Sequence, residues 1–309
     1  MRALWGRAWP LPLLPAVYAM IIAAIGDLRP EHVVFAVACP LLAYAGSRSK
    51  QFFVDFSPFI LVAMGYDAVR YVLRATLSEG RVITCGLREL ELALFAVGDG
   101  ITPQDFSEAH ALPFLDVLFA IPYGIFAYVA ALYSAYLFFV DRPRMRHYLW
   151  AFAIANYLSF VLWVLVPAAP PWYIRAHGCA VDLSVSGNPA GLARVDALFG
   201  TDYFHVFYSR ASQVFGALPS MHCAYPMIGL ITAWRAAGLR TRPLHVVYAV
   251  LMFCASVYLD HHWVVDGVLG WGIAAAACWG AGRLLGRPTA GIAPGLARTA
   301  PLASRPEAN

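Results

Sequence analysis

The sequence predicts an all-helical, polytopic membrane protein. Of its 309 residues, 61% are hydrophobic and only 13% are charged, whereas soluble domains carry about 25% charged residues. The mean hydropathy is +0.63. The apolar residues gather in segments near the length that a helix needs to cross a bilayer. The eight segments are 9–26, 32–46, 52–73, 113–140, 148–167, 218–234, 244–260 and 263–283. We therefore expect about eight spans.

The chain divides into three parts by composition. Residues 9–26 follow two arginines as in a signal peptide, but no clear small-x-small cleavage site follows, which favours a retained span. Residues 32–46 are short and could be tilted or interfacial. We expect accessory membrane segments in residues 1–50 and the main membrane domain in residues 51–285. Residues 286–309, rich in Pro, Ala, Gly and Arg, are predicted to be a disordered cytoplasmic tail.

The distribution of positive charge predicts the orientation. With the N-terminus inside, 14 of the 22 Lys and Arg residues fall on the inner side. The run Asp141–Arg146, with three arginines, is the strongest single indication. Because cytoplasmic loops carry the excess of positive charge, both termini are predicted to be cytoplasmic. The segment around residue 262 then lies on the outer face.

Two long segments, residues 75–112 and 168–217, fall on the outer side, and loops of this length are usually functional. Apolar and charged residues alternate in the first, which predicts an amphipathic helix lying on the membrane. They are Leu87, Leu90, Leu92, Leu94 and Phe95, with Arg88, Glu89, Glu91 and Asp99. Trp172, Tyr173 and Trp263 are expected in the aromatic belt of the membrane interface.

The cysteines fit the same topology. Four of the six lie in apolar segments, where free cysteine behaves as a small hydrophobe. Cys85 and Cys179 are the two in the outer segments. They could form a disulfide in an oxidising compartment, but the sequence does not give their separation. No Cys/His spacing is typical of a zinc site, and no basic cluster resembles a nucleic-acid-binding patch.

The strongest functional candidate is the stretch Tyr258–Trp271, which places two histidines and two carboxylates at the start of an apolar run. His262 and Asp266 are four residues apart, so on a helix they share one face. The aspartate could accept one ring N–H and leave the other ring nitrogen free as a base or nucleophile. Charged residues beside a span are usually functional, although an interfacial histidine beside a satisfied aspartate would give the same pattern.

A second candidate motif opens the sixth apolar segment. Pro219 and Ser220 are typical of a helix start, with Ser220 as the N-cap. His222 then lies in the first turn, where backbone N–H groups favour an anion. The predicted topology places His222 and His262 on the same face. Such a set suits phosphoryl transfer, in which one neutral histidine attacks phosphorus and the other, protonated, donates to the leaving oxygen.

These motifs resemble the second and third signature motifs of the type 2 phosphatidic acid phosphatase superfamily, Pro-Ser-Gly-His and then Ser-Arg, five residues, His, three residues, Asp. The chain is further similar to the inositol phosphorylceramide synthase branch and its bacterial inositolphosphotransferase-like relatives. The segments that carry the resemblance are Tyr66–Arg70, Val166–Tyr173, Ala190–Asp196, Val214–His222 and His261–Asp266. The resemblance implies a six-helix phosphatase-type core within residues 51–285.

The resemblance also implies roles. His262 would be the nucleophile that forms a phosphohistidine, and Asp266 would orient and stabilise it. His222 would protonate the departing diacylglycerol oxygen and then deprotonate the incoming alcohol. Asp260 and His261 would support the site without touching the substrate. Neither a metal nor a cofactor is implied.

The chain departs from the family pattern at the phosphate clamp. The usual first motif, Lys, six residues, Arg-Pro, is absent, and Met221 and Ser256 stand where the family has Gly and a phosphate-binding Arg. Another group must bind the phosphate, and an Arg fork would suit it. The candidates for substrate or phosphate binding are Arg175, Arg70, Arg210, Ser220 and Asp67. Asp67 and Arg70 are also spaced as an intramembrane ion pair, at i and i+3.

With this resemblance, the predicted activity is transfer of inositol phosphate from phosphatidylinositol to a lipid alcohol such as ceramide, at the outer face of a bacterial plasma membrane. A diacylglycerol-like or glycan alcohol stays open as acceptor. With water as acceptor, the chain would be a lipid phosphate or polyprenyl pyrophosphate phosphatase. A lipid transporter or scramblase is the alternative from another class, although few charged residues lie mid-span. The implied partners are the donor lipid, the acceptor lipid and the bilayer, without nucleic acid.

Overall fold

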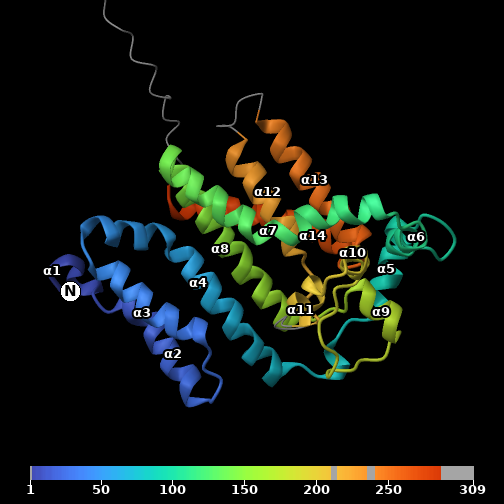
Figure 1. Cartoon of the computed structure of the whole chain (residues 1–309), viewed down its shortest axis with the longest axis horizontal. Coiled ribbons are helices and arrows are strands. Elements are labelled where there is room, and N and C mark those ends of the chain that lie inside the picture. Colours follow the sequence, from blue (N-terminus) through green and yellow to red (C-terminus); the bar gives the residue numbers. More distant parts are fainter. Residues whose placement is uncertain (1, 210–213, 235–240, 287–309) are drawn as a thin grey trace, which may run out of the picture.

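The computed structural model describes residues 2–209, 214–234 and 241–286, and over these ranges the fold is all-helical, as predicted (Figure 1). The expected tail lies almost wholly outside them. The longer helices are α2 (Leu14–Ala24), α3 (Pro30–Tyr44), α4 (Ser47–Thr76), α7 (Pro113–Val140), α8 (Arg142–Leu165), α12 (Met221–Ala233), α13 (Arg242–Tyr258) and α14 (Val264–Leu284). The short ones are α1 (Arg2–Trp5), η1 (Gly6–Ala8), η2 (Leu11–Leu13), η3 (Glu79–Arg81), α5 (Cys85–Phe95), α6 (Pro103–Ala109), α9 (Pro171–His177), α10 (Leu192–Phe199) and α11 (Tyr203–Ser209).

Each of the eight apolar segments forms a helix. Within the described ranges, α4, α7, α8 and α14 are the four helices that are long and apolar enough to cross a bilayer. The apolar helices at Leu11–Ala24, Pro30–Tyr44 and Arg242–Tyr258 are shorter. The number of spans therefore stays a prediction.

The core bundle is built around α8, which packs against α4, α7, α12 and α14. Small side chains such as Ala151 and Ala155 are fully buried on α8 and allow close approach of its neighbours. α14 also approaches the start of α12 closely, since a Cβ at Gly270 would collide with the carbonyl oxygen of Ser220. This contact fixes the start of α12 beside the first turns of α14. At another point of the bundle, the buried Asp55 of α4 pairs with Arg142 and Arg146 of α8.

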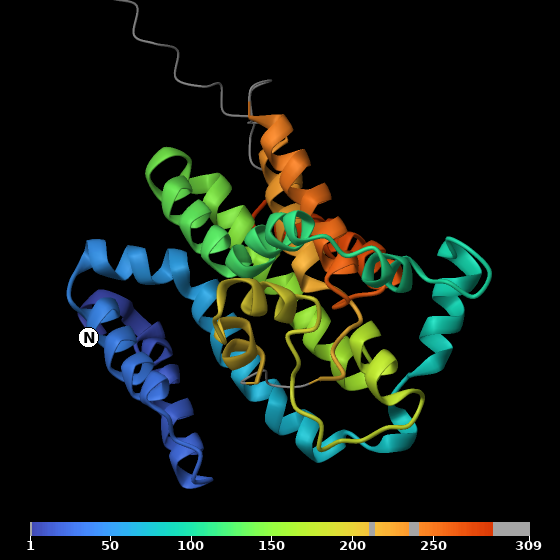
Figure 2. The ribbon, with the colours of Figure 1, turned by 45° about the vertical axis from the view of Figure 1, so that its right-hand side comes forward.

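The N-terminal helices lie beside the bundle (Figures 1 and 2), where α2 packs on α3 and α3 packs on α4. A polar cluster joins them to α4. Asp67 accepts hydrogen bonds from Arg29 and His32 at 3.1 and 3.0 Å, and Arg70 pairs with Asp27 at 3.2 Å. The Asp67–Arg70 ion pair that the i, i+3 spacing indicates is present at 2.8 Å. The division of the chain at residue 50 stays a prediction.

The outer segments form short helices on one side of the bundle (Figure 2). α5 is helical as expected, but it buries Glu91 beside Leu87, while Leu90 and Leu94 are exposed. Its first residue, Cys85, forms a disulfide with Cys179, with their Cα atoms 5.3 Å apart.

The aromatic-belt expectation is wrong for three residues. Trp172, Tyr173 and Trp263 are buried inside the protein, where they pack in one cluster with Phe215. The indole N–H of Trp263 donates to the carbonyl of Ala169 at 3.0 Å. The hydroxyl of Tyr173 donates to the carbonyl of Ala180 at 3.1 Å. These rings therefore pack inside the protein, close to the turn that carries His262.

Candidate active site

The two predicted catalytic histidines face each other. His222 lies in the first turn of α12, and His262 lies in the turn between α13 and α14. The Nδ1 atom of His222 is 3.2 Å from the Nε2 atom of His262. The predicted helix start is confirmed: Ser220 is the N-cap of α12, and its hydroxyl accepts the N–H of Cys223 at 3.3 Å. The cap orients the first turn and with it the imidazole of His222.

The partner of His262 differs from the expected one. Its Nδ1 atom is 3.0 Å from the carbonyl oxygen of Ala217 and 3.6 Å from Oδ2 of Asp266. A carbonyl can only accept, so Nδ1 carries the proton and donates it to Ala217. The Nε2 atom then holds a lone pair directed at His222. The backbone of residue 217 sets this tautomer, and the carboxylate of Asp266 lies behind it at ion-pair distance.

Asp266 has a second structural role, because His262 is not on its helix. α14 begins at Val264, so the expected one-turn spacing on a shared helix does not apply. Asp266 is buried and accepts the N–H of Trp263 at 2.9 Å through its own Oδ2. A carboxylate in the first turn also stabilises the positive end of the helix dipole. Asp266 thereby fixes the backbone that follows His262.

The turn that carries His262 is held by Ser256, at the family's phosphate-binding Arg position. The carbonyl of Ser256 accepts the N–H groups of His261 and His262 at 3.2 and 3.0 Å. Its hydroxyl is buried and lies 3.3 Å from Sγ of Cys223. Asp260 completes the turn with φ +63°, in the left-handed region. The side chain at position 256 therefore faces the protein interior.

His261 supports the site through an aromatic stack. Its Nε2 donates to the carbonyl of Pro189 at 3.0 Å. Its ring lies between Tyr208 and Tyr123, with centroid distances of 4.7 and 5.0 Å. Burial lowers the pKa of His261 to about 3, so the ring is neutral. Tyr123 in turn stacks on His222 at 4.1 Å, which extends the stack to the histidine pair.

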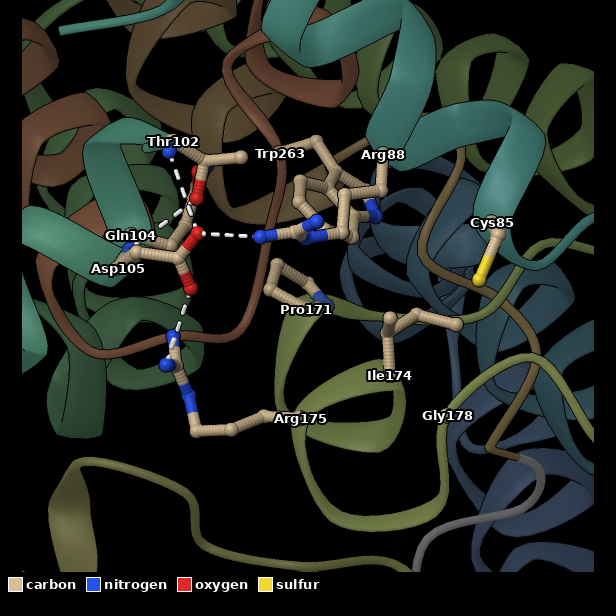
Figure 3. Close-up of a pocket in the computed structure, with 10 residues that line it drawn as sticks. All are labelled: Cys85, Arg88, Thr102, Gln104, Asp105, Pro171, Ile174, Arg175, Gly178 and Trp263. Carbon is tan, nitrogen blue, oxygen red and sulfur yellow. Dashed lines mark hydrogen bonds and ion pairs between the residues drawn. The ribbon is translucent and has the colours of Figure 1, made fainter. Parts of the chain in front are cut away.

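Arg175 binds the turn rather than the histidines. Its guanidinium forms two hydrogen bonds with Asp260, at 2.9 and 3.0 Å, which raise the pKa of Arg175. A third bond, of 3.1 Å, reaches Asp105, which also accepts from Arg88 at 2.9 Å (Figure 3). Arg175, Asp105 and Arg88 line, together with Trp263, a cavity of about 300 Å³ that neither His222 nor His262 borders. A phosphate-binding role for Arg175 stays a prediction.

The other phosphate-binding candidates are dispersed. Asp67 and Arg70 lie in the polar cluster with α2 and α3. Ser220 lies next to His222, where its N–H donates to the carbonyl of Asp266 at 3.0 Å. Arg210 lies outside the described residues. Within the described ranges, no group of three or more His, Cys, Asp or Glu side chains is arranged to hold a metal ion.

A larger cavity, of about 810 Å³, opens beside His222. Aromatic and aliphatic side chains of α4, α7 and α11 form most of its wall, among them Tyr66, Phe126, Tyr128, Tyr203, Val206, Phe207 and Tyr208. α11 is positioned by Asp196, whose carboxylate accepts the N–H of His205 at 3.0 Å and the hydroxyl of Thr201 at 2.9 Å. The sequence carries one signal from which this wall could have been predicted, the aromatic run Tyr203–Tyr208.

Comparison with known proteins identifies the family of the chain. A family model described as the PAP2 superfamily matches residues 101–280. The phosphoinositol dihydroceramide synthase of Bacteroides thetaiotaomicron is 30% identical over 265 residues, which are 84% of this chain and 86% of that protein.

Fungal relatives match a shorter part. The inositol phosphorylceramide synthase of Candida albicans is 35% identical over 161 residues, 50% of this chain and 34% of that protein. The catalytic subunit of the inositol phosphorylceramide synthase of Saccharomyces cerevisiae is 35% identical over 162 residues, 51% of this chain and 40% of that protein. No solved structure gives a significant match. Because the family model spans more than half of the chain and includes both histidines, the chain belongs to the PAP2 superfamily, in the branch of its inositol phosphorylceramide synthase relatives.

Proposed function

We propose that the chain transfers inositol phosphate from phosphatidylinositol to ceramide or a closely related lipid alcohol, through a covalent intermediate on Nε2 of His262. One observation carries the chemical part of this proposal. The Nδ1–H of His262 is directed at the carbonyl of Ala217, which leaves Nε2 as an unprotonated nucleophile 3.2 Å from His222. The names of the relatives supply the transferred phosphoinositol group and the ceramide-type acceptor. Phosphatidylinositol as the donor is part of the proposal.

The reaction then follows in two steps with one acid–base residue. The phosphoryl group of the donor enters between the two rings, and Nε2 of His262 attacks phosphorus. A P–N bond forms, the P–O bond to diacylglycerol breaks, and protonated His222 gives its proton to the leaving oxygen. In the second step the acceptor hydroxyl loses its proton to His222 and attacks phosphorus. The P–N bond breaks and His262 is regenerated.

The lining of the cavity beside His222 favours the proposal of a lipid substrate. Its wall is mostly aromatic and aliphatic, and Tyr128, Val206 and Phe207 are exposed at its border. Acyl chains gain free energy from such a surface at about 25 cal/mol per Å² of apolar area removed from water. A head group at His222 with its chains along this wall would present phosphorus to the histidine pair.

The location of the site in the cell is part of the proposal. We place the histidine pair on the outer face of a bacterial plasma membrane, with both termini in the cytoplasm, because the positive charges of the chain concentrate on the opposite side. Residues 1–50 would then be accessory to a catalytic domain in residues 51–285.

The decisive experiment uses purified protein in detergent with inositol-labelled phosphatidylinositol, with and without ceramide. We expect labelled inositol phosphorylceramide only when ceramide is present. In its absence we expect a covalently labelled protein, because the intermediate has no acceptor. His262→Ala should remove both signals, and His222→Ala should slow turnover by about 100- to 10,000-fold, the usual contribution of acid–base catalysis.

Other outcomes would redirect the proposal. Free inositol phosphate formed regardless of ceramide would identify a hydrolase. Labelled product from His262→Ala would exclude the phosphohistidine. Lipid translocation in liposomes without any phosphotransfer would favour the transporter alternative.

A further inference from the structure

Glu91 is a buried carboxylate without a cationic partner among the described residues. It projects from α5 and is 0% exposed. Its Oε1 accepts the N–H of Val264 at 2.7 Å, and its Oε2 accepts the N–H of Val265 at 3.2 Å. These are the first two residues of α14. The first N–H groups of a helix have no partner inside the helix, so a side chain from a separate helix caps α14.

Gln104 of α6 links this cap to His262. Its amide nitrogen donates to Oε1 of Glu91 at 3.0 Å and to the carbonyl oxygen of His262 at 3.1 Å. Gln104 is 1% exposed, so water does not replace these bonds readily. The carbonyl of His262 and the N–H groups of Val264 and Val265 belong to three successive peptide bonds. All three peptide bonds are thereby hydrogen-bonded to Glu91 or Gln104.

Both backbone polar groups of His262 are therefore hydrogen-bonded. Ser256 holds its N–H, and Gln104 holds its carbonyl. The N-terminus of α14 is the positive end of its helix dipole, which favours a carboxylate that accepts its first two N–H groups. Rotation of the backbone at residue 262 would break these bonds and also move Nδ1 away from the Ala217 carbonyl.

We infer that Glu91 and Gln104 are positioning residues for the phosphotransfer step: they hold the backbone of His262 so that Nε2 meets phosphorus in line. The inference rests on the proposed function. It assigns the amphipathic outer segment a part in the reaction, beyond its predicted place on the membrane surface. Neither residue belongs to the motifs that carry the family resemblance, and neither borders the lipid cavity beside His222.

The support is held in place at the other end of α5. Cys85, the first residue of that helix, is bonded to Cys179, which follows α9 closely. Arg175 of α9 binds Asp260, two residues before His262. The segment Asp260–Val265 is thus bound by side chains of three helices, α5, α6 and α9.

The test compares Glu91→Gln, Gln104→Leu and the double variant with Glu89→Gln as the matched control. Glu89 lies on the same helix and is exposed, so its variant makes the same chemical change without touching α14. Glu91→Gln keeps the shape but replaces one of the two acceptor oxygens by an NH2 group, so one of the two bonds to α14 is lost. We expect kcat to fall about 10- to 100-fold, as for loss of charge-assisted bonds or a small misplacement of a nucleophile. KM for phosphatidylinositol should stay within about 2-fold, because the lipid cavity is untouched.

Two readouts separate positioning from folding. Without acceptor, the fraction of protein that becomes labelled counts the folded sites, and the labelling rate reports the geometry of His262. We expect a full labelled fraction and a slower rate in Glu91→Gln and Gln104→Leu. The labelling rate of the double variant should be only slightly lower than that of the slower single variant, because the pair acts as one unit.

Each failure has a distinct pattern. If His262→Ala stays active, the proposed function fails and this inference fails with it. If His262→Ala is inactive while Glu91→Gln and Gln104→Leu label as fast as Glu89→Gln, the positioning inference alone is wrong. A reduced labelled fraction at an unchanged rate would assign the pair a purely structural role.

Discussion

His261 and His262 are neighbours in the sequence, but their surroundings give them different chemistry. His261 donates its Nε2–H to Pro189 and is enclosed by two tyrosine rings, so both its proton and its position are fixed. His262 donates through Nδ1 instead, which leaves Nε2 open towards His222. The choice of ring nitrogen therefore separates the supporting histidine from the candidate nucleophile.

The neutral state of His261 predicts a pH dependence of stability. Its pKa is about 3 in the folded protein because of burial, against about 6.5 in an unfolded chain. Between these values only the unfolded state binds the proton, so the free energy of unfolding falls as the pH drops below about 6.5. His261→Gln keeps a donor for Pro189 and removes the titration.

Thermal unfolding in detergent at pH 7.5 and pH 5.0 checks this. Between pH 7.5 and pH 5.0 the free energy of unfolding should fall by roughly 2 kcal/mol more in the wild type than in His261→Gln. Equal losses in the two proteins would show that His261 is not kept neutral by burial.

At the scale of elements, the contact between α12 and α14 decides the geometry of the site. Each helix carries part of the chemistry: His222 is on α12, and Asp266 is in the first turn of α14. Gly270 allows the backbone of Ser220 to approach α14, and the N–H of Ser220 donates to the carbonyl of Asp266. The absence of a side chain at Gly270 thus lets the motifs of His222 and His262, 40 residues apart, lie next to each other.

This contact predicts different outcomes for two glycines of α14. Gly270→Ala places a methyl group against the Ser220 carbonyl, so α12 must shift, at a cost of about 1–3 kcal/mol for overpacking. We expect a lower thermal midpoint and a loss of phosphotransfer that exceeds the loss of folded protein. A Cβ at Gly272 meets nothing within 4 Å. Gly272→Ala should be neutral or stabilising by up to about 1 kcal/mol, through helix propensity. Equal behaviour of the two variants would contradict the close-contact argument.

At the scale of the whole molecule, the orientation in the membrane connects fold and function. The disulfide between Cys85 and Cys179 is consistent with an oxidising outer compartment. Both cysteines lie in the outer segments whose helices support the turn of His262. The arginine-rich connection between α7 and α8 is predicted to lie on the opposite side.

Cysteine labelling in intact cells tests this orientation. Pro143 and Ser186 are exposed positions in the two regions. We expect Ser186→Cys to react with a membrane-impermeant maleimide from outside, and Pro143→Cys to react only after lysis. The wild type serves as background, because Cys254 is exposed on the protein surface. Labelling of Pro143→Cys in intact cells would reverse the predicted topology.

The sequence by itself determined the class of the protein and the parts of its site. Apolar segments of span length predicted the helices, Pro219 and Ser220 predicted the start of α12, and the histidine motifs predicted the family. These are properties of short stretches, since helix periodicity, capping and composition are local. Only the tertiary structure decided the partner of each polar side chain. Ala217 accepts the ring N–H of His262, Asp260 binds Arg175, and Glu91 accepts N–H groups at the start of α14. Such contacts join segments tens to well over a hundred residues apart, and they depend on how buried polar groups find partners once the helices have packed.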